Sequence, residues 1–131
     1  MSDSRPVPTN IAYHSKSKIL EVSFGEETTY TMSAEYLRVY SPSAEVRGHG
    51  PGQETLQVGK ENVRIENIEP VGHYAVRLVF DDGHDSGLYS WDELYRLGEE
   101  QNSLWAAYLA RLEQAGHKRK TPLNIVAGND T

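Results

Sequence analysis

Residues 18–24, KILEVSF, alternate between apolar and polar side chains, and this alternation constrains the fold more than any other feature. Successive side chains of a β-strand point to opposite faces, so Leu20, Val22 and Phe24 share one face. The segments NIAYH before it and TTYTM after it also suit short strands. Gly25, in the intervening GEE, can adopt the positive φ of a tight hairpin turn. The sequence therefore begins with a predicted antiparallel meander.

A short helix is predicted after the meander, over residues 33–40. Ser33 is a suitable N-cap, and Tyr36 and Tyr40 recur at helical spacing. The helix should end before Pro42, because proline disfavours the α conformation in the residue that precedes it.

Three further strands and two helices complete the predicted domain. The strands cover VRIENIEPV, HYAVRLVF and SGLYS, with the turn DDGHDSG before the last. Ser90 and Glu93 form a capping box for a helix over 91–97 that Gly98 should break, and a second helix covers 103–115. Trp91 should pack rather than face solvent. The order predicts one α+β domain: an antiparallel sheet, a short helix after the first strands and two C-terminal helices.

The predicted domain covers residues 9–116. Residues 1–8 are polar and hold two prolines, so we expect a flexible N-terminus. Residues 117–131 are expected to form a polar C-terminal tail, whose opening basic run HKRK should be solvated.

Composition excludes several functional classes. The 131 residues include no cysteine, which excludes disulfides and thiolate ligands from this chain. The formal net charge is −6, from 13 basic and 19 acidic side chains, so attraction to nucleic-acid phosphates is not expected. No apolar run approaches the roughly 20 residues of a membrane span, and the N-terminus lacks the apolar core of a signal peptide. We expect a cytoplasmic protein without nucleic-acid or membrane partners.

The sequence lacks the common catalytic motifs. We find no GxSxG, no GxxxxGK[ST], no GxGxxG opening a helix and no HExxH. The sequence does not exclude a Ser–His–Asp triad, because the fold rather than sequence spacing brings the three residues together.

The turn DDGHDSG crowds Asp81, Asp82, His84 and Asp85 together. One interpretation is a set of ligands for a divalent cation, or a pH-sensitive contact. The other is a hairpin turn whose Asp and Gly residues supply turn geometry and whose charges are solvated. The turn alone favours the second interpretation.

The segment YSPSAEVRGHGPGQ places Gly48, Gly50 and Gly52 around His49. Glycines permit unusual backbone conformations, and successive N–H groups can hold an anion. No helix clearly begins after the segment, which counts against a phosphate loop. Three interpretations of this segment therefore fit its sequence: a binding loop, the remains of a metal site and a tight turn.

Two separated motifs, LRVYSPSAEVRGHGPGQ and VRLVFDDGHDSGLYSWDEL, together resemble a bacterial family named for the N-terminal domain of gamma-butyrobetaine hydroxylase. The resemblance covers about residues 8–115. In the hydroxylases this domain precedes a separate oxygenase domain and carries a zinc site. Three cysteines in a C-x-C-x-x-C pattern and one histidine hold that zinc. The cysteine positions correspond to Ser41, Ser43 and Val46, and the histidine position corresponds to His84.

The resemblance implies that residues 41–52 lie near His84. The thiolate site cannot be carried over, because a serine hydroxyl is a poor zinc ligand. His49 would then approach His84, and two imidazoles with a nearby aspartate would hold Fe(II), Zn or Ni weakly. The alternative is that packing and hydrogen bonds replace the metal. The predicted binding surface comprises Ser41, Ser43, Gly48, His49, Gly50, Asp82 and His84.

We therefore expect a non-catalytic accessory or interaction module whose partner is another protein. The alternative is an iron- or zinc-binding protein linked to oxygenase or iron–sulfur metabolism, because related domains are attached to P-loop iron–sulfur carriers. A small enzyme in its own right is the third hypothesis. The oxygenase activity of the hydroxylases is not expected, because it belongs to their other domain, and apart from weak Fe or Zn no cofactor is expected.

Overall fold

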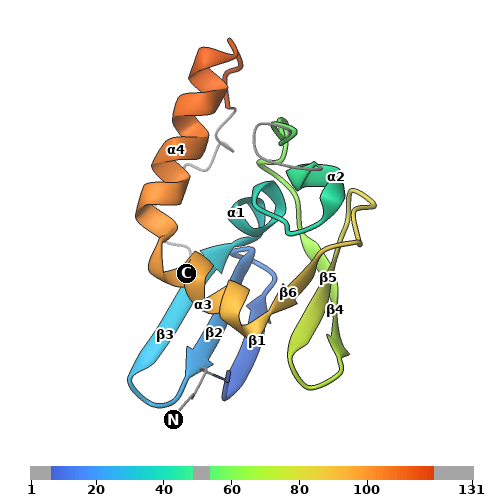
Figure 1. Cartoon of the computed structure of the whole chain (residues 1–131), viewed down its shortest axis with the longest axis vertical. Helices are drawn as coiled ribbons and strands as arrows, with labels where there is room; N and C mark the ends of the chain where they lie inside the picture. Colours follow the sequence, from blue (N-terminus) through green and yellow to red (C-terminus); the bar gives the residue numbers. More distant parts are fainter. Residues whose placement is uncertain (1–6, 49–53, 120–131) are drawn as a thin grey trace.

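The chain folds into two three-stranded antiparallel sheets with short helices between them and two helices after them (Figure 1). The computed structural model describes residues 7–48 and 54–119. The first sheet consists of β1 (Asn10–His14), β2 (Ile19–Phe24) and β3 (Thr28–Ser33), followed by α1 (Ala34–Val39) and α2 (Ala44–Arg47). The second consists of β4 (Ile65–Val71), β5 (Ala75–Phe80) and β6 (Leu88–Ser90), followed by α3 (Trp91–Glu99) and α4 (Gln101–Gln114).

The α+β prediction is confirmed, including the short helix after the first strands and the two C-terminal helices. The structure adds that the strands form two sheets rather than one, each in sequence order. A side chain links them, because the Tyr13 hydroxyl of β1 accepts a hydrogen bond from the Ile65 N–H of β4 at 3.2 Å. The sheets therefore share a core without sharing a backbone ladder.

The first sheet has the register that its alternation predicts. Val22 pairs with Ile11 on one side and with Tyr30 on the other. The Leu20 and Val22 side chains are completely buried. Gly25 adopts a φ of 82° in the turn between β2 and β3, as its position required.

α1 lies at the centre of the molecule, and all six of its residues are buried. Its N-terminus is capped as predicted, since the Ser33 Oγ accepts a hydrogen bond from Tyr36 N–H at 3.0 Å. The Tyr36 hydroxyl donates to the Leu97 carbonyl of α3 at 2.6 Å. A short helix with little intrinsic stability is thus fixed by its surroundings.

α3 begins at the predicted cap, where the Ser90 Oγ accepts from Glu93 N–H at 3.1 Å. Gly98 does not break this helix, contrary to expectation, because α3 continues to Glu99. Its role is close packing, since an added Cβ would lie 2.3 Å from Tyr30 Cγ on β3. Trp91 is half-buried against the core, and its indole N–H donates to the His73 carbonyl at 2.8 Å.

The main core lies between the two sheets, α1 and α3. It is formed by buried apolar residues from these elements, chiefly Leu20, Val22, Met32, Tyr36, Leu37, Leu78, Phe80, Tyr89, Leu94 and Leu97. A smaller cluster joins Val39 of α1 to Tyr108 and Leu112 of α4.

The segment after α4 turns back onto the domain. Gly116 has a φ of 80°, and the His117 N–H donates to the Leu112 carbonyl, which ends the helix. The Arg119 side chain then pairs with the buried Glu35 carboxylate. Arg119, expected to be solvated, is therefore anchored, and residues 120–131 lie outside the described part. None of the helices within the described residues is long and apolar enough to span a bilayer.

Candidate functional site

The segment after α1 and the turn between β5 and β6 meet at His84. The strand ends fix the turn, because the Phe80 N–H donates to the His84 carbonyl at 2.9 Å. The Asp82 side chain also accepts the His84 N–H, at 3.2 Å. Opposite it, Ser43 caps α2 by accepting from Glu45 N–H at 3.1 Å. Residues 41–52 are predicted to approach this turn, and the approach is observed for Ser41, Ser43 and Glu45, whereas residues 49–52 lie outside the described part.

Ser41, His84 and Glu45 form a continuous row of hydrogen bonds. His84 Nε2 lies 2.9 Å from Ser41 Oγ, and His84 Nδ1 lies 3.0 Å from a Glu45 carboxylate oxygen. A carboxylate only accepts, so Nδ1 carries the proton and Nε2 accepts the serine hydroxyl. Ser41 is 0% exposed and His84 is 5% exposed. We call these three residues the His84 row.

A second bond ties the same two segments together. The Ser43 and Ser86 hydroxyl oxygens lie 2.6 Å apart. Gly87, the next residue, packs directly on the row, because an added Cβ would lie 2.5 Å from Ser41 Oγ. The segment and the turn are in tight contact, and glycine is required at position 87 for that contact.

The charges around the row favour a neutral imidazole. Burial lowers the pKa of His84 below its ordinary value, and the nearby Arg38 guanidinium lowers it further, against the opposing effect of Glu45. Burial alone would raise the pKa of Asp82. The Lys60 ammonium, the His84 N–H and Arg38 outweigh that effect and lower the pKa to about 2. Asp82 therefore stays ionised and balances Arg38 and Lys60, at 2.9 and 2.7 Å.

The order hydroxyl–imidazole–carboxylate is that of a hydrolase triad, but the surroundings of Ser41 do not suit a nucleophile. The Ser41 hydroxyl is completely buried, and its oxygen also accepts from Ser43 N–H at 3.2 Å. Gly87 packs against it so closely that an added Cβ would lie 2.5 Å from the hydroxyl oxygen. The arrangement is a hydrogen-bond network whose serine and imidazole are both buried.

The residues at the family's zinc positions do not fit that metal. Ser41 and Ser43 offer neutral hydroxyls, Val46 offers no donor, and both ring nitrogens of His84 are hydrogen-bonded. Within residues 7–48 and 54–119, no group of three potential ligands is placed to hold a metal ion. Every buried polar side-chain atom in that part has a hydrogen-bond partner. The contacts that these residues make in the described part are hydrogen bonds and packing.

The predicted site residues thus fall into three groups. Ser41, Ser43 and His84 are buried and support the contact between the two segments. Asp82 lies beside them and is partly exposed. Gly48 ends α2 with a φ of 73°. His49 and Gly50 lie outside the described residues, so the proposed approach of His49 to His84 stays a prediction.

Sequence reasoning missed two residues of this site, Glu45 and Ser86. Glu45 lies two positions after Ser43, and a serine followed by an acidic residue is typical of a helix start. That signal could have revealed α2, but the bond from Glu45 to His84 depends on how α2 packs on the turn. Ser86 carries no comparable signal, because only the folded turn brings it to Ser43.

Comparisons with known proteins found a matching family and similar structures. Residues 11–95 match the family described as gamma-butyrobetaine hydroxylase-like, N-terminal. Two structures determined in solution by NMR are similar to the chain. One has 48% identity, covering 95% of this chain and 98% of the other, with a TM-score of 0.77. The second has 50% identity, covering 99% and 96%, with a TM-score of 0.78.

A third similar structure is a crystal structure of a protein of unknown function from Acidithiobacillus ferrooxidans, assigned to the DUF971 family. It is 37% identical, the match covers 74% of this chain and 98% of that protein, and the TM-score is 0.61. No curated protein matches the chain significantly.

Proposed function

We propose that this chain, which belongs to the gamma-butyrobetaine hydroxylase-like N-terminal (DUF971) family, is a non-catalytic accessory or interaction module whose partner is another protein. The observation that carries the proposal is the buried His84 row. At the position where the resemblance implies a zinc ligand set, the described residues form a hydrogen-bond network with a buried serine and a buried imidazole, which supports the proposal. Such a network holds two surface loops in fixed positions, and loops on a rigid scaffold commonly form binding surfaces.

The exposed groups beside the row supply the contact surface. Glu45 and Asp85 have 69% and 56% of their side chains exposed, and Leu88 is 47% exposed. We call these three residues the rim. Glu45 bonds to His84, Asp85 follows it, and Leu88 begins β6, so they lie near one turn. Asp85 pairs with Arg77 at 3.5 Å, and Glu45 is the more exposed carboxylate of the rim. A carboxylate beside an exposed leucine suits a partner that presents basic and apolar side chains.

Site-specific photocrosslinking in cells that express the full chain tests this proposal. A photoreactive residue at position 85 should capture one defined protein. The same residue at Glu26, in the β2–β3 turn at the far end of the molecule, is the control (Figure 1). We expect a product from position 85 alone, and the reversal Glu45→Lys should reduce it. Equal products from both positions, or none from position 85, would refute the rim as the contact surface.

Iron or zinc handling, the alternative, is supported by the family resemblance rather than by any described contact. Metal binding at His84 would have to replace its bond to Ser41 or to Glu45. Metal analysis of protein purified without an affinity tag tests this directly. The proposed function predicts less than one equivalent of bound metal, and a stoichiometric iron or zinc content would favour the alternative instead.

A further inference from the structure

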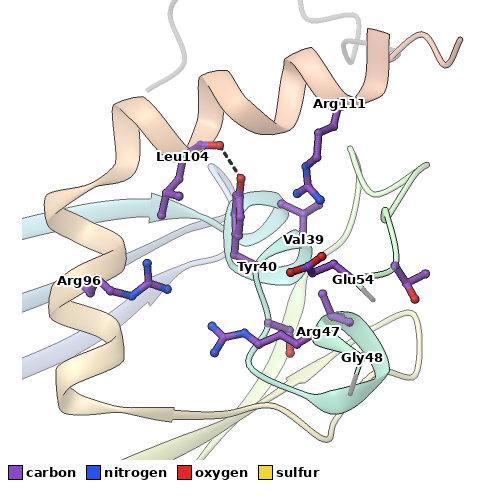
Figure 2. A pocket seen from close by; sticks show the side chains of 11 residues that line it. Val39, Tyr40, Arg47, Gly48, Glu54, Arg96, Leu104 and Arg111 are labelled. Atoms are coloured by element: carbon purple, nitrogen blue, oxygen red, sulfur yellow. Dashed lines mark hydrogen bonds between the residues drawn. The ribbon is translucent and has the colours of Figure 1, made fainter. Parts of the chain in front are cut away.

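A second site lies between α1 and α2 on one side and α4 on the other, and Ser41 of the His84 row is among the residues that line it (Figure 2). It is a cavity of about 570 Å³. Small-molecule sites typically measure about 300–1,000 Å³, so this cavity is large enough for a ligand. Its apolar lining is contributed by Val39, Val46 and Leu104. A concave surface with an apolar lining and a few charged groups is the usual form of a small-molecule site.

Arg111 is positioned as an anion-binding group of this cavity. Its guanidinium carbon lies 5.8 Å from the centroid of the Tyr40 ring. Tyr40 is itself fixed, because its hydroxyl donates to the Leu104 carbonyl at 2.7 Å (Figure 2). Stacking occupies the face of a guanidinium and leaves its in-plane N–H groups available for a bidentate bond to a carboxylate. No carboxylate within residues 7–48 and 54–119 forms an ion pair with Arg111.

The other charged groups of the cavity are differently placed. Arg47 and Arg96 point toward one another and share one Glu93 oxygen, at 2.6 and 2.8 Å (Figure 2). Arg96 also pairs with Glu100 at 3.3 Å. Glu54 is the carboxylate that lines the cavity. Two of the three guanidinium groups are thus already neutralised, and Glu54 disfavours a ligand with more than one negative charge.

We propose that this cavity binds a small organic molecule with a single carboxylate. The carboxylate pairs with the free edge of Arg111, and the apolar part of the ligand lies against Val39, Val46 and Leu104. A phosphate monoester is disfavoured, because its second negative charge would lie near Glu54. The proposal is independent of the protein partner at the rim, because none of the rim residues lines the cavity.

Two-dimensional NMR titration of the full chain with small acids tests the proposal. The probes are phenylacetate, hexanoate and cyclohexanecarboxylate, each compared with its primary amide, and phenyl phosphate is the dianionic comparison. We expect at least one acid to shift the backbone amides of Tyr40, Thr55 and Leu104. The matching amide should bind at least about tenfold more weakly, as expected for loss of a charge-assisted pair.

Variants assign the effect to Arg111. Arg111→Gln should weaken acid binding about tenfold or more, while Arg64→Gln, at an exposed arginine that does not line the cavity, should leave it unchanged. Glu54→Gln should strengthen acid binding, because it removes a nearby like charge. The proposal is overturned if no acid shifts these amides at millimolar concentration, if acids and amides bind equally, or if phenyl phosphate binds more tightly. It is also overturned if acid binding is unaffected by Arg111→Gln or is weakened by Glu54→Gln.

Discussion

Ser41 lies where the resemblance to the hydroxylases implies a zinc-binding cysteine, and its hydroxyl bonds to His84. Replacing it by alanine would leave the buried Nε2 of His84 and the Ser43 N–H without this partner. A buried polar group left unsatisfied costs about 1–3 kcal/mol, so we expect Ser41→Ala to lower the free energy of unfolding by that amount. Urea denaturation measures the loss. As a control, Ser17→Ala at an exposed turn residue should change the free energy of unfolding by less than about 0.5 kcal/mol. Equal effects of the two substitutions would contradict this role for Ser41.

Asp82 should give the chain an acid-sensitive contribution to stability. Its pKa falls from 3.8 to about 2 in the folded state, so between these values the unfolded chain binds more protons than the folded chain. The stability that Asp82 contributes is therefore complete above the unfolded value and lost as the pH falls toward 2. Denaturation of wild type and Asp82→Asn at several pH values gives the difference between their free energies of unfolding. This difference should be constant near neutral pH and should decrease below about pH 4. A difference that increases at low pH would show that Asp82 does not stabilise the folded chain through its lowered pKa.

The residues of the His84 row differ in how far the sequence could predict them. The family resemblance predicted that Ser41 lies near His84, because each residue belongs to one of the two motifs that carry the resemblance. Glu45 lies 39 positions before His84, and its bond to the imidazole depends on the packing of α2 against the turn. Local pattern carries no information about such a contact. The caps Ser33 and Ser90 were predictable because each acts within its own helix turn.

At the scale of elements, the sequence did not predict α2, and the reason is physical. It is only four residues long, from Ala44 to Arg47, which is too short to show helical periodicity. Pro42 before it and the glycines after it are typical of a loop. Its stability comes from the Ser43 cap and from the buried Val46 rather than from its own propensity.

α3 packs on β3 only because residue 98 has no side chain. A Cβ on Gly98 would overlap the Tyr30 ring, whose nearest atom would lie at 2.3 Å. Alanine is the better helix former by about 1 kcal/mol, but the overlap should outweigh that gain. We expect Gly98→Ala to lower the free energy of unfolding by at least about 1 kcal/mol, measured by thermal and chemical denaturation. Asn102→Ala, at an exposed position of α4, is the control and should have little effect. A stabilised Gly98→Ala variant would disprove the close packing.

At the scale of the whole molecule, the fold class was predictable and the number of sheets was not. Each meander is encoded locally, by alternation and by turn residues such as Gly25. Whether two meanders join into one sheet depends on contacts between distant edges. Here the contact is made by a tyrosine hydroxyl, from Tyr13 to Ile65, and no local pattern predicts it.

Arg119 extends the domain beyond its predicted end at residue 116. Its guanidinium binds Glu35, which is 6% exposed, and lies 5.4 Å from the Trp105 ring centroid. Removing one partner leaves a buried charge unpaired, so Arg119→Met should lower the free energy of unfolding by roughly 3 kcal/mol. The double variant Glu35→Gln/Arg119→Met should recover most of that loss, because it removes the unpaired charge as well. Lys118→Met, at the neighbouring exposed residue, is the matched control. If urea denaturation finds Arg119→Met as stable as Lys118→Met, the domain ends at residue 116 and the contact with Glu35 does not stabilise it.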